Sequence, residues 1–562
     1  MSSLQKYAMK SINGLRKLVL LLLIFLPLTF TVKGQMDSKK DTTEWFRRSF
    51  SLQLLQDAAP SGGQGTFRSS DTTLTSLANG DYKIKDGVFI LSGTVDTTLF
   101  SDTLTILTQS ENKLALQKGK DRITFLSTDK SLSTTFSWTG LFRGLLGIFS
   151  LLLIAFLLSK NKRRINWPLV VKGILLQVVI AVLILKVPFV ETGFDFISKA
   201  FVRVVDMAHE GAIFVFGSVI TGEMSPLVKN FVTWVLPSVI FFSALSSLLY
   251  YWGILQKVVF AMAWIMKRLM GLSGAESVSA AGNVFMGQTE APLLVKPYLN
   301  KMTKSEILCL MAGGMATIAG GVLASYIGFL GGEDPEQKVF FAKHLLTASI
   351  MSAPAAIVFS KILLPETEKI NHDLSIAKNK LGTNPLEAIA NGTADGVKLA
   401  VNVAAMLIVF ISLIALANYI LGQFGSVTGL NAIIAEHSSL YDGLSFQYIV
   451  GNALSPIAWL MGVPPQDTLI IGQLLGEKTI INEFVAYPHL GELQDELTGK
   501  SVIIGTYVLC GFANFASIGI QVGGIGALAP EKKPVLAKYG VLSLIAGTLA
   551  CMLTATMVGM LY

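Results

Sequence analysis

Glutamine, threonine and a carboxylate interrupt an apolar segment of the chain at Gly287-Gln288-Thr289-Glu290. The segment is Gly282–Leu299, GNVFMGQTEAPLLVKPYL, and both of its flanks are apolar. A carboxylate in such surroundings is costly to place in lipid unless it faces a cavity or a partner. The segment is too short to cross a bilayer twice, because each crossing needs about 20 residues. Glycine and proline around the acid therefore predict two half-helices that meet near the membrane midplane and line a transporter's binding site.

A second acidic break follows later in the chain, at Ile481-Asn482-Glu483-Phe484. Each break lies in an expected hairpin, Glu276–Leu299 or Asp467–Leu490, which follows an amphipathic helix and precedes a glycine-rich span. The alternation of the spans puts the first hairpin at the inner side of the membrane and the second at the outer side. Two re-entrant hairpins of opposite orientation are typical of secondary transporters built from inverted repeats.

The composition of the whole chain indicates a polytopic membrane protein. Its 562 residues are 52% hydrophobic and 15% charged, and the mean hydropathy is +0.58. The net charge of +8 does not imply a nucleic-acid partner, because much of the lysine and arginine lies in short loops between apolar spans. Three cysteines and five histidines form no disulfide framework, metal-ligand spacing or catalytic motif, so we expect no enzyme.

The N-terminal quarter differs from the rest. Basic residues precede the apolar stretch Leu18–Val32, which predicts a signal peptide over residues 1–34, with an uncleaved anchor as the alternative. Residues 35–137 are rich in threonine, serine, aspartate and lysine, and they contain alternating runs separated by turn signals. This pattern predicts a small β-rich domain, which the signal peptide would make extracytoplasmic. The sequence assigns it no function.

Eight transmembrane helices are expected from residue 138 onward, so the remaining chain is predicted to be an all-α membrane protein. The basic cluster Lys160–Arg164 after the first span places that loop in the cytoplasm, and the alternation then puts the C-terminus outside. Residues 138–260 form a scaffold part, 261–395 the first hairpin repeat, and 396–562 a scaffold helix with the second. An amphipathic helix, Phe194–Phe216, is expected near an interface. The expected spans are Trp138–Leu158, Pro168–Val187, Phe231–Tyr251, Ile307–Leu330, Phe340–Leu364, Val397–Leu421, Ser501–Ile525 and Val535–Leu561.

Four blocks of this membrane part resemble the concentrative nucleoside transporter family of sodium-coupled symporters. The resemblance covers about residues 140–562 and leaves the N-terminal domain unexplained. It implies import of a nucleoside, Na⁺ as the coupling ion and a homotrimer. The opposed hairpins predict alternating access, and the signal peptide with the exported domain predicts a bacterial inner membrane. The blocks are GNVFMGQTEAPLLVKPYL at 282–299, MATIAGGVLASY at 315–326, NEFVAY at 482–487 and CGFANFASIGIQVGG at 510–524.

The resemblance also implies how a nucleoside is divided between the two repeats. The base would lie against the first repeat, where amide and hydroxyl groups suit its edge and a valine its ring. The ribose would lie against the second, where a carboxylate that accepts from hydroxyls makes strong hydrogen bonds. The expected substrate-binding residues are Gly287, Gln288, Thr289, Glu290 and Val322 in the first repeat, and Glu483, Phe512, Asn514 and Ser517 in the second.

The Na⁺ site follows from the same resemblance. It would take the side-chain oxygen of Asn283, the hydroxyl of Thr317 and the backbone carbonyls of Met286 and Ile318. Neutral oxygens of this kind favour Na⁺ over H⁺, and proton coupling through one of the two buried acids is the alternative.

Other functions stay open at this point. A transporter of the same fold could carry a nucleobase or another polar metabolite. A receptor would need a cytoplasmic effector, and the longest expected inner segment, Lys361–Asp395, is short for one. A membrane enzyme would need a nucleophile–base pair or a metal motif. The sequence does not distinguish purine from pyrimidine preference, nor does it give the coupling stoichiometry.

Overall fold

The structure, a computed structural model, describes eight strands between residues 42 and 127, and residues 138–562 except 221–235, 333, 372–382, 438–440 and 495. Contacts divide the chain into two compact units, Met1–Ser133 and Thr134–Tyr562. The expected signal peptide, residues 1–34, lies outside the described residues.

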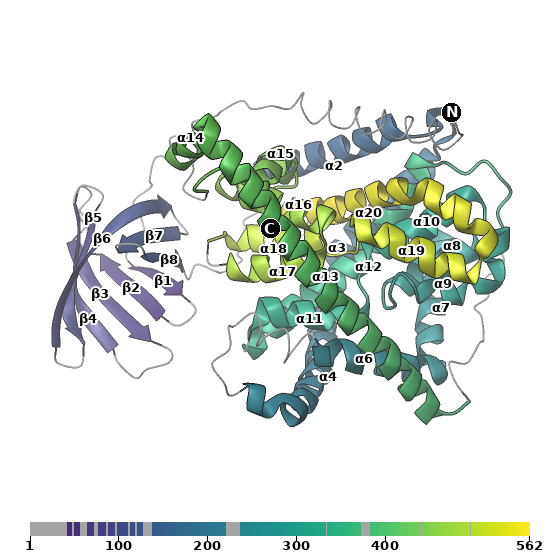
Figure 1. The fold of residues 1–562 in the computed structure, drawn as a ribbon, viewed down its shortest axis with the longest axis horizontal. Helices are drawn as coiled ribbons and strands as arrows, with labels where there is room; N and C mark the ends of the chain where they lie inside the picture. The colour runs from purple at the N-terminus through teal and green to yellow at the C-terminus, as the bar shows by residue number, and fades with distance from the viewer. Residues whose placement is uncertain are drawn as a thin grey trace. The chain divides into compact units, whose positions relative to one another are not determined.

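The first unit contains a closed barrel of eight antiparallel strands (Figure 1). Each strand pairs with its neighbour in the chain, and β1 also pairs with β8. Closure leaves no free sheet edge, which removes the usual template for pairing with another chain. The strands fall within the residues for which a β-rich domain was expected. They are β1 (Thr42–Arg47), β2 (Phe50–Gln56), β3 (Gln64–Asp71), β4 (Leu77–Lys85), β5 (Val88–Val95), β6 (Thr98–Ser110), β7 (Lys113–Lys118) and β8 (Asp121–Ser127).

The second unit is helical, and in its described part five helices are long and apolar enough to cross a membrane. The number rises to seven if each of two sharply bent helix pairs is one span, so the expected eight stays a prediction. Figure 1 shows the long helix α13, which packs along α6, and α20, which packs on α10 and α12. The first half of the unit has α2 (Trp138–Leu158), α3 (Trp167–Lys186), α4 (Pro188–Ile220), α6 (Leu236–Tyr251), α7 (Ile254–Met270), α8 (Gly274–Asn283), α9 (Ala291–Leu294), α10 (Lys304–Ala316), α11 (Gly320–Gly331) and α12 (Pro335–Leu363). The second half has α13 (Pro385–Thr428), α14 (Leu430–His437), α15 (Phe446–Leu460), α16 (Thr468–Ile480), α17 (Glu483–Glu492), α18 (Gly499–Leu509), α19 (Phe515–Leu528) and α20 (Lys533–Leu561).

Most expected spans correspond to helices, but two do not run unbroken. The first predicted span has the bounds of α2, and α3, α12 and α20 begin and end within a few residues of expectation. The expected span Ile307–Leu330 lies within Lys304–Gly331, which is long and apolar enough to cross a membrane, but it contains α10 and α11 with a break between them. Ser501–Ile525 likewise contains α18 and α19 with a break between them. The second break has a local cause. Gly511 has a φ of +128°, a conformation that side chains disfavour, and Asn514 then caps α19.

The two acidic segments are also interrupted at the expected places. In the first, α8 ends at Asn283 and α9 begins at Ala291, so the GQTE residues lie outside both helices. In the second, α16 ends at Ile480 and α17 begins at Glu483. The two helices of each pair pack against each other. Four helix breaks of the described residues therefore belong to the acidic segments and to the helices that follow them, two in each.

Candidate substrate site between the two repeats

The four breaks lie close together in the helical unit. The amide of Gly320 donates to the carbonyl of Phe285 at 3.2 Å, which joins the α10–α11 break to the α8–α9 break. A Cβ added at Gly511 would lie 2.7 Å from the carbonyl oxygen of Ala316, so the α18–α19 break packs against the end of α10 with backbone in contact. Residues from both repeats can therefore share one site.

Glu483 is the buried acid of this site and has two hydrogen-bond donors. Its side chain is 2% exposed. The hydroxyl of Tyr326 on α11 donates to one carboxylate oxygen at 3.1 Å, and Nδ2 of Asn514 donates to the other at 3.0 Å. Lys478, one helix earlier, is also buried but donates to the carbonyl of Val508 at 2.9 Å. Within the described residues Glu483 forms no ion pair, and its two side-chain donors are neutral groups, which can be exchanged for a ligand's hydroxyls.

Asn514 and Ser517 connect this acid to the first repeat. Oδ1 of Asn514 accepts from the backbone amide of Ser517 at 2.8 Å and thereby caps α19. The hydroxyl of Ser517 accepts from Nε2 of Gln288 at 3.1 Å. Gln288 belongs to the α8–α9 break, so this bond spans the two repeats.

Gln521 is the last residue of this hydrogen-bonded series and is bonded to Gln288. Its Nε2 donates to Oε1 of Gln288 at 3.0 Å and to the carbonyl of Met311 at 3.0 Å. Gln521 is fully buried, and its Oε1 has no partner among the described residues. We call the six residues that are joined in this way the polar chain. In order they are Tyr326, Glu483, Asn514, Ser517, Gln288 and Gln521.

The other predicted substrate residues lie beside the polar chain but are not bonded into it. Glu290 is partly exposed, and its carboxylate accepts from the amide of Gly287 at 3.3 Å within its own turn. Thr289 is exposed and packs against α19, since a Cβ at Gly524 would lie 3.0 Å from its methyl group. Val322 is 2% exposed in the core, and Phe512 is partly exposed.

The predicted Na⁺ ligands meet where α8 ends. Asn283 is 1% exposed, and neither its Oδ1 nor its Nδ2 has a hydrogen-bond partner in the described part of the chain. A Cβ at Gly313 would lie 2.8 Å from Asn283 Nδ2, and the hydroxyl of Thr317 donates to the carbonyl of the same glycine at 2.9 Å. Met286 and Ile318 are both buried in the adjoining breaks. An unsatisfied buried amide oxygen beside a hydroxyl fits a hard cation with oxygen ligands, whereas no cluster of three histidine, cysteine or acidic side chains occurs in the described residues.

Two residues of the polar chain were missed from the sequence. Tyr326 closes the block MATIAGGVLASY, but nothing local marks its hydroxyl as a ligand rather than as an interfacial group. Gln521 did carry a signal, because it is the one strongly polar residue in the apolar run Ile518–Ile525, and such residues in membrane helices bond across helices.

Buried polar clusters also hold the start of each acidic segment. Glu276 pairs with Lys361 on α12, and Lys361 donates to Ser305 at 2.9 Å. Lys361, which opens the segment expected on the inner side, lies in the last turn of α12 and is 5% exposed. In the second repeat, the fully buried Asp467 accepts from the hydroxyls of Thr498 and Ser501, each at 2.7 Å.

Family models and known proteins match most of the helical unit. Residues 146–219 match the model "Na+ dependent nucleoside transporter N-terminus", 232–333 match "Nucleoside recognition", and 344–559 match "Na+ dependent nucleoside transporter C-terminus". The mouse protein "Solute carrier family 28 member 3" is 40% identical over 433 residues, which are 74% of this chain but only 58% of that protein. An "uncharacterized transporter" of Haemophilus influenzae is 41% identical over 424 residues. The matched residues are 74% of this chain and 96% of that protein.

A solved structure has a similar fold. It is described as CNTnw in an inward-facing substrate-bound state, and it shares 35% sequence identity with this chain. The superposition has a TM-score of 0.68 and covers 75% of this chain and 98% of that one. The chain thus spans little more than half of the mouse relative but nearly all of the bacterial relative and of the solved structure. The relatives are named as transporters, which agrees with the expectation that the chain is not an enzyme.

Proposed function

Since the chain belongs to the Na⁺ dependent nucleoside transporter family, we propose that it imports nucleosides by symport with Na⁺ across a bacterial inner membrane. The polar chain is the observation that carries this proposal. It places a buried carboxylate with neutral donors at one end and two carboxamides at the other, within one site shared by both repeats. A ribose and a base present matching groups at their two ends.

The ribose binds at the second repeat in this proposal. Glu483 accepts from its vicinal hydroxyls, Asn514 and Ser517 bond to the same groups, and the ring of Phe512 covers the sugar. An ionised carboxylate forms charge-assisted bonds with hydroxyls, and these are about twice as strong as neutral ones. A sugar that lacks one hydroxyl would leave a buried acceptor unpaired, which costs ~1–3 kcal/mol.

The base binds at the first repeat. Gln288 and Thr289 bond to its edge, Glu290 accepts from an N–H directly or through water, and Val322 contacts the ring. Gly287 lets the backbone of the break come close to the ligand. The carboxamide of Gln288 forms two hydrogen bonds, one to Ser517 and one from Gln521. A base can replace one of these partners without leaving the carboxamide unpaired.

Na⁺ is the co-substrate. Asn283 and Thr317 contribute side-chain oxygens, and Met286 and Ile318 contribute backbone carbonyls exposed by the two breaks. Support comes from the unsatisfied buried Oδ1 of Asn283 and from its packing on Gly313, next to Thr317.

The proposal extends to the arrangement in the membrane. Two re-entrant hairpins of opposite orientation, eight spans and a homotrimer follow the family resemblance. Residues 1–34 direct export, and residues 35–137 and the C-terminus are extracytoplasmic. Access alternates when the part that bears the hairpins moves against the scaffold. Cross-linking of the purified protein tests the trimer, and labelling of cysteines introduced into loops tests the orientation.

Uptake of radiolabelled uridine and adenosine into proteoliposomes tests the function. We expect accumulation that needs an inward Na⁺ gradient, that ribose-free uracil does not inhibit, and that is lost in Glu483→Gln. Glu492→Gln is the matched control, because Glu492 is an exposed acid of the same helix. Accumulation driven only by a pH gradient would contradict the Na⁺ site, and no uptake of either nucleoside by folded protein would overturn the substrate.

A further inference from the structure

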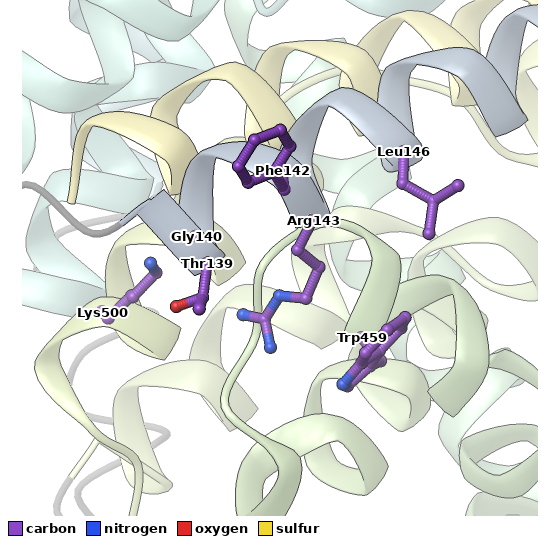
Figure 2. Close-up of a pocket in the computed structure, with 7 residues that line it drawn as sticks. All are labelled: Thr139, Gly140, Phe142, Arg143, Leu146, Trp459 and Lys500. Atoms are coloured by element: carbon purple, nitrogen blue, oxygen red, sulfur yellow. The ribbon is translucent and has the colours of Figure 1, made fainter.

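A pocket outside the substrate site lies between α2, the end of α15 and the start of α18 (Figure 2). Its volume is about 620 Å³. Figure 2 shows that Arg143 extends from α2 toward the α15 end, with Lys500 nearby on α18. Its lining includes Thr139, Phe142, Arg143, Leu146, Trp459 and Lys500.

Arg143 and Lys500, the two cations of this pocket, form no ion pair with an acid among the residues that the structure describes. No lining residue is an acid. The guanidinium of Arg143 donates through Nη2 to the carbonyl of Gly462 and lies 5.5 Å from the centre of the Trp459 ring. These contacts fix its position, yet its Nε is buried with no partner among the described residues. Lys500 forms no ion pair or hydrogen bond within the described part of the chain, and the charge of Arg143 acts on it unfavourably.

Asp467, an acid near the start of α18, already accepts hydrogen bonds from other groups. Asp467 accepts from the backbone amide and hydroxyl of Thr498, at 3.0 and 2.7 Å, and from Ser501. These bonds hold the Asp467 carboxylate at the N-terminus of α18, and Asp467 is 1% exposed. Lys500 is the second residue of α18, and a cation near a helix N-terminus is unfavourable. Two uncompensated cations and this helix end therefore favour an anion in the pocket.

The rim of the pocket indicates what carries the anion. Phe142 is 66% exposed and Leu146 49% exposed, one turn apart along α2, a helix with the length and composition of a membrane span. Trp459 is 41% exposed, and tryptophans are enriched at the level of lipid headgroups. Basic pockets between membrane helices on the cytoplasmic side bind lipid headgroups, and this pocket has the same combination of basic side chains and membrane helices. A small soluble anion would use the cations but not this apolar strip.

We propose that Arg143 and Lys500 bind the phosphate of an anionic phospholipid, whose acyl chains lie along Phe142 and Leu146. Arg143, held by Gly462 and Trp459, presents its guanidinium to the pocket, Lys500 presents its ammonium, and Thr139 also lines the pocket. The site is separate from the polar chain and does not depend on the proposed substrate.

Native mass spectrometry of the full-length protein tests the proposal. Protein in neutral detergent is titrated with phosphatidylglycerol, with phosphatidylcholine or with inorganic phosphate, and bound adducts and melting temperature are recorded. One basic residue contributes ~1 kcal/mol of attraction to an anionic lipid, so we expect Lys500→Gln to weaken phosphatidylglycerol binding about fivefold. Phosphatidylcholine binding should not change. Lys398→Gln is the matched control, since Lys398 is an exposed lysine on α13.

Each result of these titrations either supports or overturns the lipid site. A loss of selectivity for phosphatidylglycerol in Lys500→Gln but not in Lys398→Gln supports the site. Equal phosphatidylglycerol binding by all three proteins overturns it. Stabilisation by inorganic phosphate that equals the lipid effect and is lost in Lys500→Gln shows a small-anion site and overturns the lipid. Arg143→Gln is the second variant and must give the same loss of selectivity, provided that its melting temperature shows a folded protein.

Discussion

Replacing Asn514 by serine would separate two functions of its side chain. The Oδ1 atom caps α19 through the amide of Ser517 at 2.8 Å, and Nδ2 donates to Glu483 at 3.0 Å. Serine caps a helix about as well as asparagine, whereas alanine costs ~1 kcal/mol. The shorter serine side chain cannot reach the carboxylate from the same position. Asn514→Ser should therefore keep the cap of α19 and lose the bond to Glu483.

The size of the effect follows from the charge on Glu483. A hydrogen bond to a charged group contributes ~1.5–3 kcal/mol, and each 1.4 kcal/mol corresponds to about a tenfold change in affinity. We expect the KM for nucleoside uptake to rise roughly 10- to 100-fold in Asn514→Ser. The melting temperature should fall less in Asn514→Ser than in Asn514→Ala, which loses the cap of α19 as well.

Initial rates of Na⁺-driven uridine uptake, together with melting curves in detergent, measure both effects. Asn482→Ser is the matched control, because Asn482 caps α17 through the amide of Val485 in the same way. It should change neither KM nor stability. A parental KM in Asn514→Ser would refute the reasoning, and so would a KM rise of the same size in the control.

Three further outcomes follow from single contacts. Tyr326→Phe removes the other donor to the buried carboxylate and should raise the KM for nucleoside about tenfold; Tyr487→Phe, whose hydroxyl bonds a backbone carbonyl instead, should not. Asn283→Ala should shift the Na⁺ activation curve of uptake to higher Na⁺ with little change in nucleoside KM at saturating Na⁺, and an unshifted curve would remove this residue from the ion site. Gly511→Ala should lower the melting temperature, because it combines a φ of +128° with a Cβ contact of 2.7 Å, whereas Gly519→Ala, which has open space and a helical backbone, should be neutral or stabilising.

The residues Glu483, Asn514 and Ser517, which the sequence assigned to one site, are joined by hydrogen bonds in the structure, and there is a physical reason why the sequence singled them out. Acids in apolar spans are costly, so Glu483 stands out in any reading of the chain. Asn514 and Ser517 lie in a matching block and also form a helix-capping pattern. The same reasoning gave Glu290 an equal rank, yet its carboxylate bonds only within its own turn among the described residues. Cost of burial identifies a residue but does not show what it contacts.

The broken helices could not be predicted from hydropathy alone. Thr317 and Asn514 lie in long apolar stretches whose composition fits a continuous span, and the mean over such a stretch hides a short interruption. The break after α10 becomes favourable only in the fold, where the amide of Gly320 finds the carbonyl of Phe285. Free backbone groups in a membrane are tolerated only when other parts of the protein satisfy them. Tertiary contacts, and not the local sequence pattern, therefore determine where these helices break.

The position of the proposed Na⁺ ligands suggests how the ion and the nucleoside affect each other. Asn283 and Gln288 lie at the two ends of one break, and the bond between Gly320 and Phe285 ties that break to the one that holds Thr317. An ion bound by oxygens from both breaks would hold them together and thereby keep Gln288 oriented toward Ser517. Linkage then requires that a nucleoside bound by Gln288 raise the affinity for Na⁺ by the same factor. Coupling of this kind needs no direct contact between the ion and the base.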